Sequence, residues 1–238
     1  GLGDVYKRQC TNGIGYVDLM FKTDSIAPEQ IPYLGLLKSV LGYVDTENYT
    51  YGELFNEINA NTGGINCGVE VFDRADSTEE FQAMFSVRGK ALYTKMDFLF
   101  KMIGEILNSS KLEDTKRLYE IVASVKSRAQ VNLTGAGHST AVLRAAAYSS
   151  PMAAFQDEMA GIGYYQFIEK LEKDFEQRKE ETVEELCKLM KKILRPENFM
   201  ISYTGERESL ETVQKLAGTV KAGLGTEPVE KSKEKLTC

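Results

Sequence analysis

The residues best suited to chemistry lie in one short stretch, GAGHSTAVLRAAAYSS, at positions 135–150. It contains His138, the only histidine of the chain, and Arg144 and Tyr148 follow at one-turn spacing on a predicted helix. A histidine can act as a general base, as a metal ligand, or as the partner of a nucleophile. The stretch is therefore the first place to look for a site.

A single histidine excludes much of this chemistry. Zinc hydrolases of the HExxH or inverted HxxEH type need two histidines one helical turn apart. A serine or cysteine nucleophile needs only one histidine, but the sequence has no GxSxG elbow and no cysteine in an obvious nucleophile context. Phosphate loops of the GxxxxGK[ST] or strand-linked GxGxxG type are also missing. The sequence predicts no catalytic residue, no metal ligand and no cofactor bound by this chain.

Four residues remain as candidates for an interface or a wall around a ligand. The simplest interpretation of His138 and Arg144 is a histidine at a helix start and a buried or interface arginine. The alternative is contact with a partner domain or a substrate. Gly63 and Gly64, in NTGGINCG, are predicted to end a helix and begin a close-packed strand. The alternative interpretation places these two glycines in a turn near a bound peptide. An independent enzyme that uses His138 is a further hypothesis.

Composition limits the partners. The net charge is −6 and no basic cluster stands out, which argues against a nucleic-acid surface. No apolar run approaches the roughly 18 residues of a membrane span. Nothing at the beginning of the sequence has the order of a signal peptide. We expect a cytoplasmic location in a bacterium, or an organelle matrix in a eukaryote.

Hydrophobic periodicity predicts an α+β layer. Alternating patterns predict strands at 14–22, 65–72, 81–89 and 199–204, of which the second and third form an antiparallel pair. Helical patterns are expected at 28–41, 51–62, 92–107, 112–133, 152–159, 164–178, 180–194 and 208–220, with another helix capped by Ser139. The expected fold is a mostly antiparallel sheet of about four or more strands packed against helices.

The same patterns divide the chain into three parts. Residues 1–10, glycine-rich and without period, are expected to be a non-native or frayed leader. Residues 11–221 are expected to form a single α+β domain. Residues 222–238 are polar, charged and contain a proline, which is typical of a linker to a following domain.

Taken in order, these segments resemble a known family. Three segments look like the third domain of the presequence proteases. In chain order they are TNGIGYVDLMF, PYLGLLKSVLGYVDTENYTYGELFNEINANTGGI and GHSTAVLRAAAYSSPMAAFQDEMAGIGYYQFI. These enzymes belong to the insulinase and pitrilysin group of zinc metallopeptidases. The resemblance runs from Thr11 to the segment after Val220, and its specificity comes from the order and spacing of the motifs.

The resemblance implies four similar α+β domains that close around a peptide chamber. It places the zinc and its inverted HxxEH motif in the first domain, so no ligand is carried over to this chain. The family's substrate-holding arginine and tyrosine belong to the fourth domain, so Arg144 and Tyr148 do not take that role.

The function expected from the resemblance is that of a non-catalytic domain of a peptide-degrading zinc endopeptidase. The partners implied are neighbouring domains of the same polypeptide and a peptide substrate, with no nucleic acid and no membrane. The alternative is a catalytically inactive structural subunit of the processing-peptidase or core-protein type.

Overall fold

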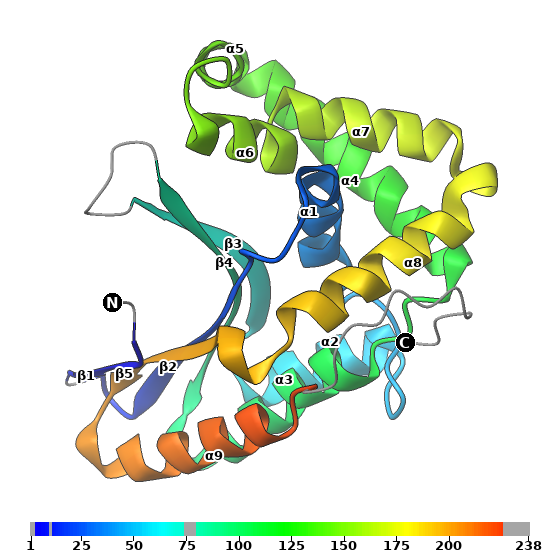
Figure 1. Ribbon diagram of the computed structural model, residues 1–238. Coiled ribbons are helices and arrows are strands. Elements are labelled where there is room, and N and C mark those ends of the chain that lie inside the picture. The colour runs from blue at the N-terminus through cyan, green and yellow to red at the C-terminus, as the bar shows by residue number, and fades with distance from the viewer. Residues whose placement is uncertain (1–2, 10, 74–79, 226–238) are drawn as a thin grey trace.

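The computed structural model describes residues 3–9, 11–73 and 80–225 and contains one sheet and a set of α-helices (Figure 1). The strands are β1 (Val5–Arg8), β2 (Ile14–Lys22), β3 (Ile65–Asp73), β4 (Phe81–Leu92) and β5 (Phe199–Gly205). The helices are α1 (Ile31–Val40), α2 (Tyr51–Asn61), α3 (Met96–Ser109), α4 (Thr115–Gly135), α5 (Gly137–Ala146), α6 (Pro151–Ala160), α7 (Ile162–Lys173), α8 (Phe175–Ile193) and α9 (Leu210–Ala222).

The sheet has the strand order β1-β5-β2-β4-β3. β1 pairs parallel with β5, and the other three pairs of neighbours are antiparallel. The predicted pair is present as β3 and β4, in register from Ile65 opposite Gly89 to Asp73 opposite Phe81. A mostly antiparallel sheet with helices packed against it confirms the predicted α+β class.

β2 lies at the centre of the sheet, with one face buried and the other only partly buried. Val17, Leu19 and Phe21 alternate along the strand and are buried in the main core. On the opposite face Met20 is buried in a separate cluster with Met84 and Met200. β4 and β5 pair with the two edges of β2 and satisfy its backbone hydrogen bonds.

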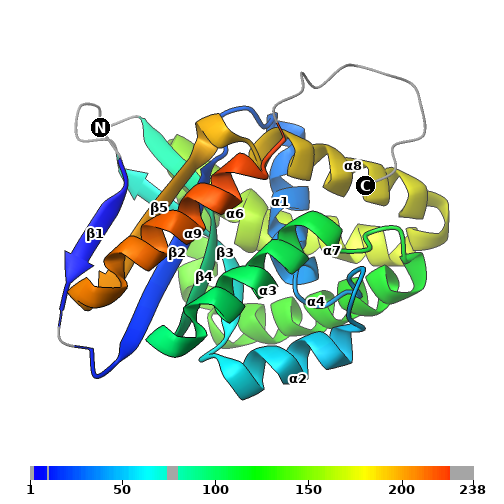
Figure 2. The ribbon, with the colours of Figure 1, turned by 90° about the horizontal axis from the view of Figure 1, so that it is seen from below.

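The helices form two layers on one side of the sheet. α1 packs on β3, α3 on β4 and α9 on β5. α3 and α9 lie side by side along this side of the sheet (Figures 1 and 2). α4, α7 and α8 pack on α1 from the side away from the sheet, and α6 covers its remaining flank.

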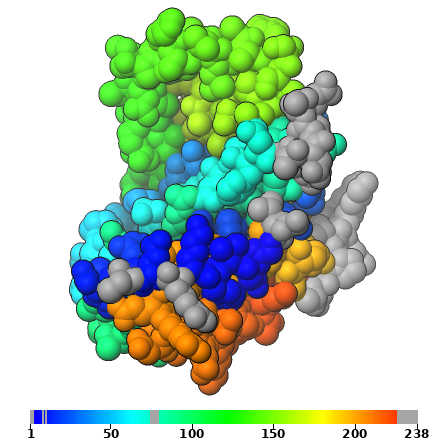
Figure 3. Space-filling model, turned by 90° about the vertical axis from the view of Figure 1, so that its left-hand side faces the viewer, coloured from blue at the N-terminus to red at the C-terminus, as the bar shows by residue number. Residues whose placement is uncertain are grey.

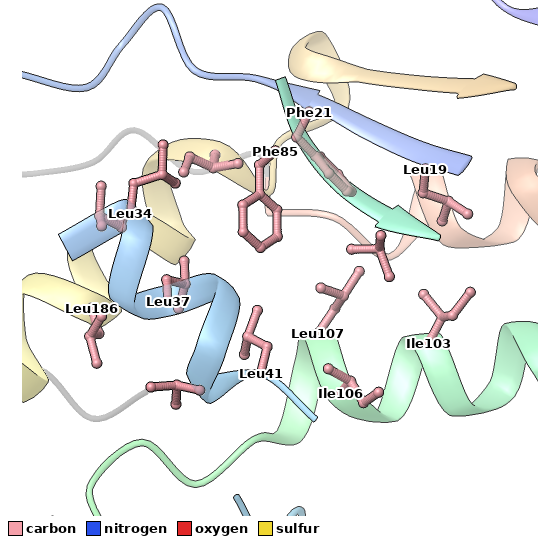
Figure 4. Close-up of a cluster of buried hydrophobic side chains, with 14 of the residues drawn as sticks. Leu19, Phe21, Leu34, Leu37, Leu41, Phe85, Ile103, Ile106, Leu107 and Leu186 are labelled. Carbon is pink, nitrogen blue, oxygen red and sulfur yellow. The ribbon is translucent and has the colours of Figure 1, made fainter. Parts of the chain in front are cut away.

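α1 is enclosed by both layers. Its sequence, IPYLGLLKSV, is apolar nearly all round, which is typical of a helix buried on every side. Figure 4 shows Leu34 and Leu37 between Phe85 of β4 and Leu186 of α8. All four side chains are almost completely buried, so the sheet and the outer helices meet through α1.

A glycine allows the outer helices to approach α1 closely. A Cβ atom on Gly35 would lie 2.5 Å from the carbonyl oxygen of Met159 and 2.9 Å from a ring carbon of Tyr164. Both distances are too short for real side-chain contacts. Gly35 therefore sets how closely α6 and α7 pack on α1.

The structure contains a strand within residues 1–10, for which the sequence predicts only a leader. Val5–Arg8 form β1, at the edge of the sheet beside β5. The strand is four residues long, too short for alternation to give a clear signal. The sequence patterns therefore missed this element.

One predicted helix boundary is wrong. The break expected between 164–178 and 180–194 lies at Asp174, between α7 and α8. Phe175 begins α8 and packs its ring against Tyr119 of α4, with centroids 5.3 Å apart. The hydrophobic period continues across the break, so only this tertiary contact shows where the chain turns.

Two predicted segments fall largely outside the described residues. These are the loop between β3 and β4, described except for 74–79, and the linker from 222 onward, described only to 225. Within the described part, no helix combines the length and apolar character needed to cross a membrane.

Shortening Leu37 to alanine tests the role of α1. Leu37 is 1% exposed between the sheet and the outer helices, so Leu37→Ala is expected to lower the free energy of unfolding by about 2–5 kcal/mol. The control is Leu92→Ala, because Leu92 is 54% exposed and its loss should cost no more than about 0.5 kcal/mol. Urea unfolding measures both, and equal costs would contradict the central place of α1.

Candidate functional site

His138 and Arg144 both lie on α5, but in different surroundings. His138 is exposed in the first turn, whereas Arg144 is half-buried in the last turn. Tyr148 follows the helix with 87% of its side chain exposed. The stretch therefore does not bring these three residues together around one point.

The N-cap predicted at Ser139 is wrong, because α5 begins at Gly137. Ala136 alone separates α4 from α5: its N–H donates to Asn132 and its carbonyl accepts from the N–H of Thr140. The Ser139 hydroxyl instead donates to the Ala136 carbonyl at 2.9 Å. With one residue between the two helices, the cap position cannot lie as late as Ser139.

Arg144 forms an ion pair with a buried carboxylate on the neighbouring helix. Its Nη1 lies 2.5 Å from Oδ2 of Asp157 on α6, and the Asp157 side chain is 1% exposed. The Asp157 carboxylate raises the pKa of the Arg144 guanidinium through this hydrogen bond and the charge attraction. Within the described residues, Arg144 therefore connects α5 to α6.

Asp157 also caps the N-terminus of α7. Its Oδ1 accepts from the N–H of Ile162 at 3.1 Å, and its Oδ2 accepts from the N–H of Gly163 at 3.3 Å. Free N–H groups at a helix start favour a carboxylate there. A Cβ on Gly161 or Gly163 would lie 2.7 or 2.8 Å from the Asp157 oxygens, so both positions need glycine.

Sequence reasoning missed Asp157. Its only signal is the spacing of an aspartate before the glycines of DEMAGIG. That spacing resembles many loops, and only the fold shows that the carboxylate turns back onto the next helix. Asp157 and Arg144 together tie α5, α6 and the start of α7 into one unit.

A cavity of about 420 Å³ lies beside this unit, between α1, α4, the start of α5 and the junction of α6 with α7. Its polar lining consists of Lys38, Ser39, Arg128, Asn132, Thr140 and Tyr164. The remaining wall is mostly apolar, with Val125, Leu133 and three alanines. Thr140 and Ala136 bring the His138 stretch to the cavity, while His138 itself is not part of the lining.

The two charged groups of the cavity are both cations. Lys38 is half-buried on α1 and Arg128 is exposed on α4. Within the part of the chain that the structure describes, neither forms an ion pair with a carboxylate. Burial lowers the pKa of Lys38, since desolvation disfavours its charged form.

One residue that lines the cavity, Tyr164, has a buried hydroxyl without a hydrogen bond in the described part of the chain. Tyr164 is 5% exposed, and its hydroxyl oxygen finds no partner among the described residues. Burial raises the pKa of Tyr164, while the Arg128 guanidinium and the Ser39 hydroxyl oppose the rise from nearby. Ser39 does not reach hydrogen-bond geometry, so the tyrosine donor is unused.

Gly63 and Gly64 lie between α2, whose C-cap is Thr62, and the start of β3. The N–H of Gly63 donates to the carbonyl of Lys90 at 2.7 Å, and a Cβ on Gly63 would lie 2.5 Å from the Lys90 side chain. Gly64 has a φ of +109°, a conformation that residues with a Cβ rarely adopt. Figure 1 shows this connection well separated from α5, so the four predicted interface residues do not form one site.

The described residues do not fit a zinc site. Over residues 3–9, 11–73 and 80–225, no group of three or more histidine, cysteine, aspartate or glutamate side chains is placed to hold a metal ion. The single histidine is exposed on α5.

The fold itself is found among solved structures. The chain is similar to a conserved protein from Enterococcus faecalis V583, with a TM-score of 0.58 over 88% of this chain and 48% of that chain. The sequences are 14% identical, so this likeness concerns the fold alone. It defines the class as an α+β domain that also occurs within longer chains.

The family follows from the sequence match. The family model "Peptidase M-16C associated" matches residues 4–171, which is more than half of the chain. The chain belongs to this family and is a peptidase-related domain.

Curated relatives agree with this assignment. "Protein HypA" of Clostridium perfringens is 34% identical over 201 residues, covering 84% of this chain and 20% of the relative. The mitochondrial presequence protease of Yarrowia lipolytica is 29% identical, over 71% of this chain and 17% of the relative. Presequence protease 1 of Arabidopsis thaliana is 26% identical, over 86% of this chain and 19% of the relative. The predicted resemblance to presequence proteases is confirmed, and the chain spans about a fifth of these relatives' length.

Asp157→Asn tests the carboxylate that joins α5, α6 and α7. An amide removes the charge opposite Arg144 and cannot accept from both backbone N–H groups equally, so we expect a loss of about 3 kcal/mol in unfolding free energy. Arg144→Gln is the matched variant and should cost about 1 kcal/mol, because Arg144 is 38% exposed and Asp157 keeps its backbone donors. Equal losses of unfolding free energy in the two variants would mean that the ion pair with Arg144 stabilises the fold more than the cap on α7 does.

Gly64→Ala tests the connection between α2 and β3. The positive φ should make this change cost about 1–3 kcal/mol of unfolding free energy. Gly52→Ala is the control, because Gly52 lies in α2 with open space around it and alanine favours a helix by up to about 1 kcal/mol. Chemical unfolding of both variants should give shifts of opposite sign. If Gly64→Ala leaves the unfolding free energy unchanged, the backbone relaxes at this position.

Proposed function

We propose that this chain is a non-catalytic domain of a longer zinc metalloendopeptidase of the presequence-protease type. In this proposal it walls a closed peptide chamber and packs against the half of the polypeptide that binds zinc. Family membership and the named presequence proteases support it. The observation that carries the chamber role is the side of the sheet that the helices leave uncovered.

The side of the sheet opposite the helices provides a wall. α1, α3 and α9 lie on one side (Figure 1), and on the other side strand atoms reach the surface below the green helices (Figure 3). We call this second side the open sheet face, and alternation along the strands assigns to it Tyr16, Asp18, Glu70, Phe72, Arg88 and Leu92, together with the buried Met20 and Met84. Tyr16, Phe72 and Leu92 are all exposed there.

The open sheet face is held together by charges across three strands. Arg88 of β4 pairs with Asp18 of β2 at 3.3 Å and with Glu70 of β3. Ser86 donates a hydrogen bond to the same Asp18 carboxylate. A rigid face that combines exposed aromatic rings with polar groups suits contact with extended peptides of varied sequence.

In this proposal the reaction occurs outside this chain. A zinc ion held by another part of the polypeptide supplies the activated water of a metallopeptidase. The residues described here contribute confinement: a closed chamber excludes bulk water and admits peptides that fit inside. We propose a bacterial cytoplasm for such a protein, or an organelle matrix if its source is eukaryotic.

The second candidate is a structural subunit that kept the fold and lost catalysis. The absence of a zinc-binding group among the described residues is compatible with both candidates. The full reading frame separates them. An HxxEH motif on the same polypeptide supports the peptidase, whereas a full-length chain without one supports the structural subunit.

Kinetics of the full-length protein test the chamber role. Tyr16→Glu places a charge on the open sheet face, so we expect KM for a chamber-sized peptide to rise about threefold or more, with kcat nearly unchanged. Tyr43→Glu is the control, because Tyr43 is equally exposed but lies on the loop after α1, away from the open sheet face. Removal of zinc with a chelator should abolish hydrolysis in all variants.

Two results would overturn the proposal. One is a full-length protein that hydrolyses no peptide with zinc present. The other is an equal effect of Tyr16→Glu and Tyr43→Glu on KM, which would show that the open sheet face does not meet the substrate.

A further inference from the structure

The cavity between α1, α4, α5 and the α6–α7 junction has a charge opposite to that of the chain. The chain carries a net charge of −6, yet the cavity is lined by Lys38 and Arg128, with no acidic residue among its described lining. An unpaired lysine on an otherwise apolar helix is costly to bury. The burial of such a lysine becomes favourable when an anion lies beside its ammonium group.

The Tyr164 hydroxyl points to the same kind of ligand. Tyr164 lines the cavity, and its hydroxyl oxygen is buried without a hydrogen bond to the described residues, so a ligand that reaches this hydroxyl would satisfy it. Ser39, Asn132 and Thr140 add further polar groups to the lining. The donors therefore come from four separate segments and converge on one space.

We propose that this cavity binds a small organic carboxylate, whose charge lies between Lys38 and Arg128 and accepts a hydrogen bond from Tyr164. Its apolar part lies against Val125, Leu133 and the neighbouring alanines. The inference concerns a site separate from the open sheet face and does not depend on the proposed peptidase role.

The chemistry of the wall favours an organic carboxylate over inorganic phosphate. A guanidinium matches the two oxygens of a carboxylate, and two cations suffice for a single negative charge. The volume of about 420 Å³ lies in the range of small-molecule sites and leaves room for an apolar group. Inorganic phosphate would leave the apolar wall unused.

Binding to the purified chain tests the proposal with a matched pair of probes. Acetyl-alanyl-leucine carries a free carboxylate, and its C-terminal amide has nearly the same shape without the charge. We expect the acid to bind and the amide to bind at least about tenfold more weakly, as measured by isothermal titration calorimetry. No peptidase activity is required, so failure here and failure of the proposed function are distinguishable.

Substitutions locate the ligand. Arg128→Ala and Lys38→Met should each weaken acid binding about tenfold, and Tyr164→Phe, which keeps the buried ring, about threefold. Lys116→Ala is the control, because it removes a positive charge from an exposed position on the same helix as Arg128. It should leave binding unchanged, and circular dichroism of each variant checks that the fold is retained.

Longer and shorter probes identify the source of the carboxylate. Equal affinity for an acetylated hexapeptide with a free C-terminus would identify the end of a peptide as the ligand. Binding of acetyl-leucine but not of the hexapeptide would identify a free small carboxylate, and both results support the proposal. It is overturned if acid and amide bind alike or not at all, if phosphate binds more tightly than the acid, or if Lys116→Ala weakens binding as much as Arg128→Ala.

Discussion

The rest of the structure depends on the burial of α1 from every side. Its side chains are apolar nearly all round the helix, so one covering layer would leave many of them in water. The sheet covers one side through Phe85, and the outer helices cover the other through residues such as Leu186. Gly35 allows the second contact to be close. This constraint explains why the outer helices form a separate layer rather than spreading over the sheet.

The same constraint explains the position of the polar features. Lys38 and Ser39 lie at the C-terminal end of the buried helix and reach the space where the outer helices do not close on it. Asp157 is buried nearby, and its contacts with Arg144 and the start of α7 keep those helices in place. The cavity is thus bounded by rigid elements. The open sheet face is independent of it and lies on the other side of the sheet.

Much of the fold could be predicted from local patterns. β2 and the β3–β4 pair follow from alternation, and Gly63 and Gly64 lie in the predicted connection between a helix and a strand. β1 escaped prediction because its pairing with distant β5 supplies the order that four residues alone cannot. The turn at Asp174 escaped because the helical period runs through it. In both cases a contact remote in the sequence decides the local structure.

The sequence by itself determined the class of fold, the family resemblance and the exclusion of an HxxEH site, because a single histidine cannot supply two ligands. It also identified Arg144 as a residue of interest, without its partner. Only the tertiary structure decided that Asp157 is that partner, and that Lys38, Arg128 and Tyr164 line one cavity. The three cavity residues lie on helices far apart in the chain, so no spacing rule relates them. The packing of α4 and α7 around α1 brings them together.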